Sequence, residues 1–90
     1  MISYYQASKI AYDYFKSKCN VVGLSEAMEN NTCFVFSSGK ANAVNFGGIT
    51  ITVDKINSNI NVLRFPSKES TNIIKNSVQL EICKDFIDNN

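Results

Sequence analysis

Residues 49–65, ITITVDKINSNINVLRF, contain the pattern that decides the fold. Apolar and polar residues alternate through residues 49–54, the period of two that is typical of a β-strand with one buried face and one solvated face. A polar cluster at residues 57–59 interrupts the run, and apolar residues resume the alternation at residues 60–62. The segment therefore predicts a β-hairpin, and the rest of the chain is expected to pair beside it or pack across its apolar face.

A helix is predicted at the start of the chain. Ser3 and Gln6 have the spacing of a capping box, which places the first helical residue at Tyr4. Six residues fall on one broad apolar face when the chain turns by about 100° per residue. The helix is expected to end near Lys18, because cationic side chains suit the negative end of the helix dipole. The apolar face consists of Tyr4, Ala7, Ile10, Ala11, Tyr14 and Phe15.

Two strands are predicted between this helix and the hairpin. Residues 20–29 favour a strand with a bulge at Gly23, and a short helical turn is the alternative. Residues 32–37 (TCFVFS) carry apolar side chains on both faces, which indicates a central strand covered on both sides. Residues 38–48 contain three glycines and two asparagines and are expected to form a loop.

The C-terminal part predicts a second helix. Pro66 ends the last strand, and Ser67 or Ser70 can cap the helix, which is expected to run to Ile87. An alternation at residues 78–82 leaves a late strand open as the alternative. The expected fold is α+β, a single domain over residues 1–90: an N-terminal helix packed on a four-stranded antiparallel meander sheet, with a C-terminal helix on the same face.

Composition excludes several classes of function. The formal net charge is +1 with no run of like charge, so neither nucleic acid nor a membrane surface is an expected partner. No signal peptide or membrane span is visible, and we expect a cytoplasmic protein. Cys19, Cys33 and Cys83 are odd in number and far apart, which favours free buried thiols over disulfides or a zinc site.

The residues do not predict an enzyme. The chain has no histidine, which removes every histidine-based triad and metal cage, and no cofactor is expected. Asp54 and Lys55 are interpreted as a turn cap or a local ion pair at the hairpin. Glu26 and Glu29 are interpreted as part of a solvated sheet edge, because no other ligand or base accompanies them.

The order of elements and the hairpin residues resemble the immunity protein 35 family, which includes small YrhB-like bacterial proteins. The family's tryptophan is replaced by Cys33 or Phe34, and its turn glycine by the polar cluster at residues 57–59, where asparagine can supply the same backbone conformation. The resemblance implies an antitoxin that binds a cognate secreted or contact-delivered toxin in the cytoplasm, with no catalytic residue. The matching positions are Gly48, Ile51, Val53, Asp54, Lys55, Ile60 and Leu63.

Two surfaces are candidates for binding the toxin. Tyr5 and Tyr12 lie off the apolar face of the first helix, flanked by Lys9 and Lys16, and tyrosines on a solvated face are typical interface anchors. The alternative is that one tyrosine covers a loop or terminus of the same domain. The other candidate is the glycine-rich loop, with Lys40, Asn42, Asn45 and Phe46.

The free protein is expected to be a monomer or a weak homodimer. A small chaperone-like or peptide-binding protein, adding a strand to an open sheet edge, remains the alternative function.

Overall fold

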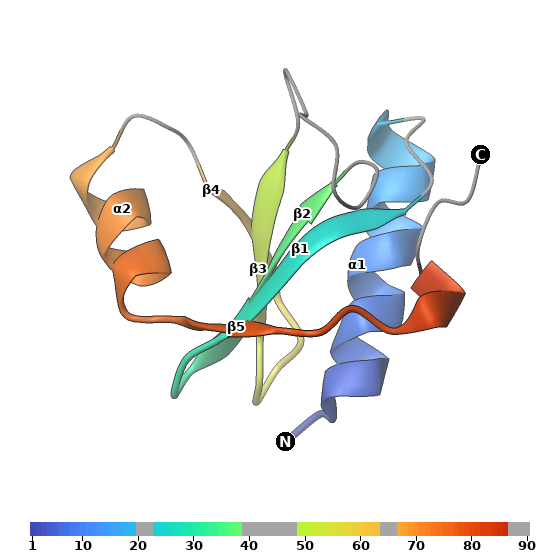
Figure 1. The fold of residues 1–90 in the computed structure, drawn as a ribbon, viewed down its shortest axis with the longest axis horizontal. Coiled ribbons are helices and arrows are strands. Elements are labelled where there is room, and N and C mark those ends of the chain that lie inside the picture. Colours follow the sequence, from blue (N-terminus) through green and yellow to red (C-terminus); the bar gives the residue numbers. More distant parts are fainter. Residues whose placement is uncertain (20–22, 39–48, 64–66, 87–90) are drawn as a thin grey trace.

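The computed structural model describes residues 1–19, 23–38, 49–63 and 67–86. Neighbouring strands of its one sheet are antiparallel, in the order β4-β3-β2-β1-β5. The predicted α+β class and the meander are confirmed, and the sheet has five strands where four were predicted (Figure 1). The elements are α1 (Tyr4–Cys19), β1 (Leu24–Glu29), β2 (Cys33–Ser38), β3 (Thr50–Asp54), β4 (Ile60–Leu63), α2 (Lys68–Lys75), β5 (Val78–Leu80) and the 3-10 helix η1 (Lys84–Phe86).

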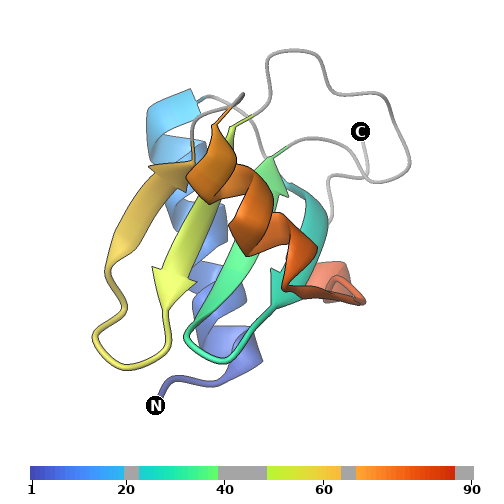
Figure 2. The ribbon, with the colours of Figure 1, turned by 90° about the vertical axis from the view of Figure 1, so that its left-hand side faces the viewer.

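The two helices lie on opposite faces of the sheet (Figures 1 and 2). The prediction that both helices cover one face is therefore wrong. The reason is the position of β4 and β5 at the two edges of the sheet, because the chain between them has to cross the sheet. It crosses over the face that α1 leaves open, and α2 is part of this crossing.

The main core lies between α1 and the sheet. Ser3 and Gln6 form the predicted capping box, in which Ser3 N donates to Gln6 Oε1 at 2.9 Å and Gln6 N donates to Ser3 Oγ at 3.1 Å. The small residues Ala7 and Ala11 are fully buried, which brings the helix axis close to the strands. The core is completed by Phe15, Leu24, Ala27, Phe34, Phe36, Ile51, Val53 and Phe86.

The second face of the sheet is also covered. Val35 and Thr52 are paired across β2 and β3 and are only 2% and 6% exposed. Because strand residues alternate between faces, both point away from the α1 core. Helix α2 lies on this second face (Figure 2), and Ser67 caps it by accepting a hydrogen bond from Ser70 N at 3.0 Å. The prediction of a central strand covered on both sides is confirmed for β2.

The β3–β4 turn is held by Asp54, as predicted. Its Oδ1 accepts hydrogen bonds from the backbone N–H groups of Ile56 at 2.8 Å and Asn57 at 3.2 Å. The left-handed residue of the turn is Ser58, with φ of 63°, where an asparagine was expected to supply that conformation. These hydrogen bonds fix the backbone of the turn.

Strand β1 contains the expected bulge at a slightly later position. Gly23 has φ of 135° and precedes the strand, and the register with β2 shifts between Leu24 and Glu26. Ser25 Oγ lies 3.2 and 3.1 Å from the carbonyl oxygens of Ser37 and Ser38. Its single hydroxyl proton is shared between these two backbone acceptors where the ladder is interrupted.

The predicted C-terminal helix is confirmed as α2, but its predicted continuation through residues 78–86 is wrong and the late strand is correct; Ile87 lies outside the described residues. Helix α2 ends at Lys75, where Asn76 N donates to Asn72 O at 3.1 Å. Residues 78–80 then pair antiparallel with β1. The local helix propensity is overridden because the outer edge of β1 offers unpaired backbone groups to a segment that alternates with period two.

Candidate functional site

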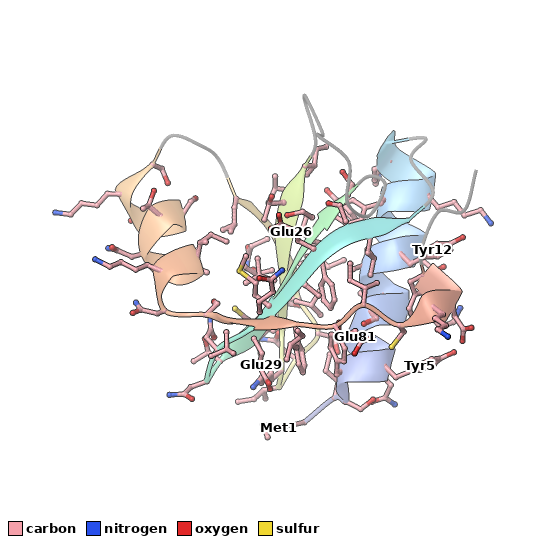
Figure 3. All side chains as sticks on the ribbon, in the orientation of Figure 1. Met1, Tyr5, Tyr12, Glu26, Glu29 and Glu81 are labelled. Carbon is pink, nitrogen blue, oxygen red and sulfur yellow. The ribbon has the colours of Figure 1, made fainter. Side chains whose placement is uncertain are left out.

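An aromatic cluster of Tyr5, Tyr12 and Phe86 joins α1 to η1. The Phe86 ring lies 5.3 Å from the Tyr5 ring and 5.5 Å from the Tyr12 ring, both in tilted arrangements. Tyr5 is 51% exposed and its hydroxyl donates to Asp85 Oδ2 at 3.4 Å, whereas Tyr12 is half-buried. Figure 3 shows both tyrosines projecting from α1 on the side away from the sheet. The cluster is a preformed amphipathic surface of the kind that protein interfaces use.

The tyrosines also cover a terminal segment, since both contact Phe86 of η1. The alternative that a tyrosine covers a terminus of the same domain is therefore also correct, while Tyr5 still exposes half of its surface to solvent. Lys9 and Lys16 are exposed on the same helix, and Lys9 Nζ lies 3.5 Å from Asp13 Oδ2. The loop candidates Lys40, Asn42, Asn45 and Phe46 lie outside the described residues.

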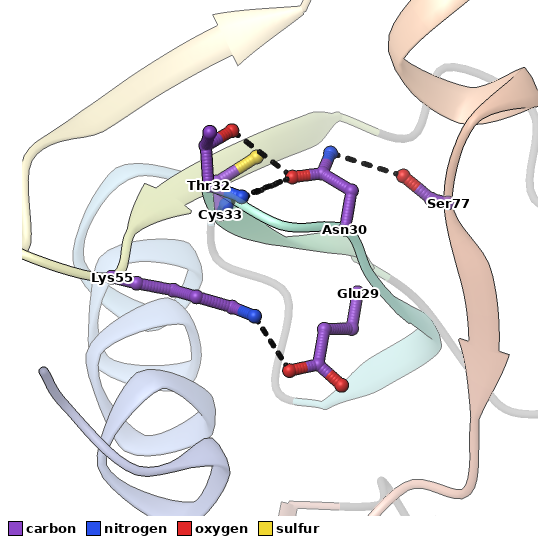
Figure 4. Close-up of polar contacts among 6 residues, drawn as sticks. All are labelled: Glu29, Asn30, Thr32, Cys33, Lys55 and Ser77. Atoms are coloured by element: carbon purple, nitrogen blue, oxygen red, sulfur yellow. Dashed lines mark hydrogen bonds and ion pairs between the residues drawn. The ribbon is translucent and has the colours of Figure 1, made fainter.

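Asn30 connects the β1–β2 turn to the start of β5 (Figure 4). Its Oδ1 accepts from Thr32 N at 2.9 Å, Thr32 Oγ1 at 3.0 Å and Cys33 N at 2.9 Å. Its Nδ2 donates to Ser77 Oγ at 3.2 Å, and Ser77 Oγ donates to Ile73 O at 2.6 Å. One amide side chain thus fixes the turn and the position of the segment that follows α2.

Lys55 joins the two hairpins at the same end of the molecule. Its Nζ donates to Glu29 Oε2 at 2.7 Å and lies 5.0 Å from the centre of the Phe34 ring. Its backbone N–H donates to Thr32 O at 3.0 Å. Of the two interpretations given for Asp54 and Lys55, the turn cap is correct and the local ion pair is not, because Lys55 pairs with Glu29 instead. Asp54 serves as the turn cap, and Glu29 is a partner in this pair while Glu26 is exposed.

Tyr4, the first residue of α1, is half-buried and connects this helix to the segment after β5. Its hydroxyl donates to Glu81 O at 2.8 Å, and its ring stacks on Phe36 with 6.1 Å between centroids. Burial raises the pKa of Tyr4 above its ordinary value of 10.0. The nearby Ser8 hydroxyl lowers this pKa, and Cys83 and Glu81 raise it. Ser8 Oγ itself is buried and makes no hydrogen bond of good geometry within the described residues.

The raised pKa predicts a loss of stability at alkaline pH. The unfolded chain ionises at Tyr4 first, so the stabilisation is complete below about pH 10 and is lost as the pH rises through the higher pKa of the folded state. We expect Tyr4→Phe to cost about 1 kcal/mol at neutral pH through the lost hydrogen bond, and to make the alkaline decline shallower. Urea unfolding between about pH 9 and pH 11 measures both effects. If the free energy of unfolding falls with pH equally steeply in the wild type and in Tyr4→Phe, the alkaline decline does not come from Tyr4.

In the described parts of the chain, no three His, Cys, Asp or Glu side chains are placed to hold a metal ion. Cys33 and Cys83 are free thiols and half-buried, where buried thiols were predicted, and the Cys19 side chain lies outside the description. Among residues 1–19, 23–38, 49–63 and 67–86, no helix has the length and apolar character needed to cross a bilayer.

Comparisons with protein-family models, curated proteins and solved structures found no match to this chain. The surfaces above are therefore described from their own geometry. Sequence reasoning missed the role of Phe86, which was placed in a helix, and the link from Asn30 to Ser77. No local pattern signals either one, because the contacts of Phe86 with the tyrosines and of Asn30 with Ser77 join residues far apart in the chain.

Proposed function

We propose that this chain is a bacterial immunity protein that binds a cognate secreted or contact-delivered toxin in the cytoplasm and neutralises it sterically. It transforms no substrate and works by placing a preformed surface over the toxin's active site or over a part that has to move. The proposal starts from the resemblance of the hairpin residues to the immunity protein 35 family.

The observation that carries the proposal is the aromatic cluster. Tyr5 is held by the Phe86 ring and by Asp85, yet half of its surface is free. A tyrosine that is already fixed loses little conformational entropy on binding, and tyrosines are enriched among the residues that dominate binding energy. The exposed lysines of α1 provide a polar rim around it.

The near-neutral charge supports a toxin contact based on shape. The chain has nine basic and eight acidic residues without a block of either sign. Inhibition by imitation of a nucleic-acid backbone would need a strongly acidic surface. The proposed contact therefore leaves the chemistry of the toxin open.

A peptide-binding or chaperone-like function is the second candidate. The specific observation in its favour is β5, a short edge strand without a charged residue or proline. The position of the gene separates the two: a neighbouring reading frame that ends in a toxin domain favours immunity, and an isolated gene favours the chaperone.

The binding test uses the polypeptide encoded by the reading frame next to this gene. We expect the wild-type chain to form a complex with it on size exclusion and to abolish its toxicity in co-expression. Tyr5→Ala and Tyr12→Ala are each expected to weaken the complex by about tenfold or more in calorimetric titration, since buried tyrosines commonly contribute over 1 kcal/mol at interfaces.

Lys68→Ala on α2 is the matched control, since Lys68 is exposed on the opposite side of the sheet. It is expected to bind as the wild type does. Circular dichroism establishes that each variant is folded. Two folded tyrosine variants with undiminished binding would contradict the role of the cluster.

A further inference from the structure

We propose that strand β5 and the hollow beside it bind an extended, uncharged segment of the partner protein, which adds to the sheet as a sixth strand. This inference rests on the proposed function and names the chemistry of the partner's binding segment. It concerns a surface separate from the aromatic cluster, at the end of the sheet where the Asn30 and Lys55 contacts gather.

The backbone of β5 makes it a template for another strand. It is the last strand of the sheet, and in the described parts of the chain only β1 pairs with it. An edge strand presents a row of backbone N–H and C=O groups to its outer side. Natural edges are commonly protected by shortness, charged side chains, proline or a bulge; β5 is short, at three residues, but contains no charged residue and no proline. Val78 is 69% exposed.

Hydrogen bonds within the free protein already fix the start of β5. Ser77, which precedes the strand, accepts a hydrogen bond from Asn30 and donates one to Ile73 O. The three residues of β5 are then in register with Ala27, Met28 and Glu29 of β1. A preformed edge reduces the ordering cost that a binding strand has to overcome.

The hollow beside β5 determines which side chains fit. It has a volume of about 710 Å³ and is lined by apolar Ile73, Val78 and Leu80 and by amide side chains of asparagines. Among the described residues, the charged side chains that line it are Glu29 and Lys55, which pair with each other at 2.7 Å. A charged side chain of the partner would find no free counter-ion there, so an uncharged, apolar side chain is the matching occupant.

The other edge and a second copy of this chain fit less well. The hollow beside β4, of about 490 Å³, includes Glu69, whose carboxylate makes no ion pair within the described residues. Self-pairing of two β5 strands joins three residues from each chain, far fewer than the roughly 20–30 residues a side of a stable interface. A longer partner segment can pair with β5 and also fill the hollow.

The test measures binding of the product of the neighbouring reading frame by calorimetry. Val78→Lys and Val78→Asp are both expected to weaken the complex by about tenfold or more, because either charge enters an uncharged contact. The matched control is Val62→Asp on β4, where Val62 is 46% exposed, and its affinity is expected to equal that of the wild type. Hydrogen exchange of the backbone amides in residues 78–80 is expected to slow in the complex, which contact through side chains alone would not cause.

Each outcome decides the proposal. If only one of Val78→Lys and Val78→Asp weakens the complex, recognition is electrostatic, and the proposal that the partner's segment is uncharged is overturned. Wild-type affinity for both Val78 variants, a loss at Val62 instead, or unchanged exchange of residues 78–80 would overturn the β5 assignment while the immunity function stands. Self-association of the free chain that Val78→Lys abolishes would identify a second copy as the occupant. Absence of any wild-type complex would overturn the proposed function and this inference together.

Discussion

Replacing Phe36 by alanine is expected to lower the free energy of unfolding by about 3–5 kcal/mol, the usual cost of removing a fully buried phenylalanine. Phe36 is fully buried in the centre of the sheet, paired with Ala27 on one side and Ile51 on the other. The Tyr4 ring stacks on it from α1. The loss would leave a cavity between helix and sheet that backbone movement cannot fill, because both neighbours are held in the strand ladder.

Urea unfolding followed by circular dichroism measures this loss, and Ile56→Ala is the control. Ile56 is 81% exposed in the β3–β4 turn, so its truncation is expected to change stability by about 0.5 kcal/mol or less. Similar losses for the two variants would mean that Phe36 does not occupy the core described above.

Replacing Asn30 by alanine is expected to cost about 2 kcal/mol. The change removes the acceptor shared by Thr32 and Cys33 and the donor to Ser77 in one step. The contacts with Cys33 N and Ser77 Oγ are half-buried, and buried polar groups that lose their partner carry a desolvation cost of about 1–3 kcal/mol. Since the turn and the start of β5 share this side chain, β5 is expected to separate from β1 more often, and its amides to exchange faster.

Asn31→Ala is the control for this prediction, because Asn31 is the exposed neighbour in the same turn. It is expected to change stability by about 0.5 kcal/mol or less. Asn30→Asp keeps the acceptor and removes the donor to Ser77, so it separates the two contributions. Faster exchange of residues 78–80 in Asn30→Asp, with the β1–β2 turn intact, would assign the anchoring of β5 to the Ser77 contact. Equal stability of Asn30→Ala and the wild type would contradict the network.

Only part of the candidate surfaces could be predicted from the sequence. The spacing of Tyr5 and Tyr12 placed both on a helix and off the main apolar face, which was enough to select them. Their exposure could not be predicted, since it depends on Phe86, which reaches them only after β5 has passed across the edge of the sheet. The pairing of Lys55 with Glu29 was likewise hidden, because the two residues meet only when β2 and its neighbours are in register.

The sequence by itself determined the elements whose signals are local. Ser3 and Gln6 begin α1, Asp54 closes the β3–β4 turn, and Ser67 begins α2, because each of these contacts spans only a few residues. Tertiary structure alone decided the conformation of residues 78–80. Residues 78–80 carry a weak helical and a weak strand preference, and the open edge of β1 selects the strand by supplying hydrogen bonds that a continued helix would leave unmade.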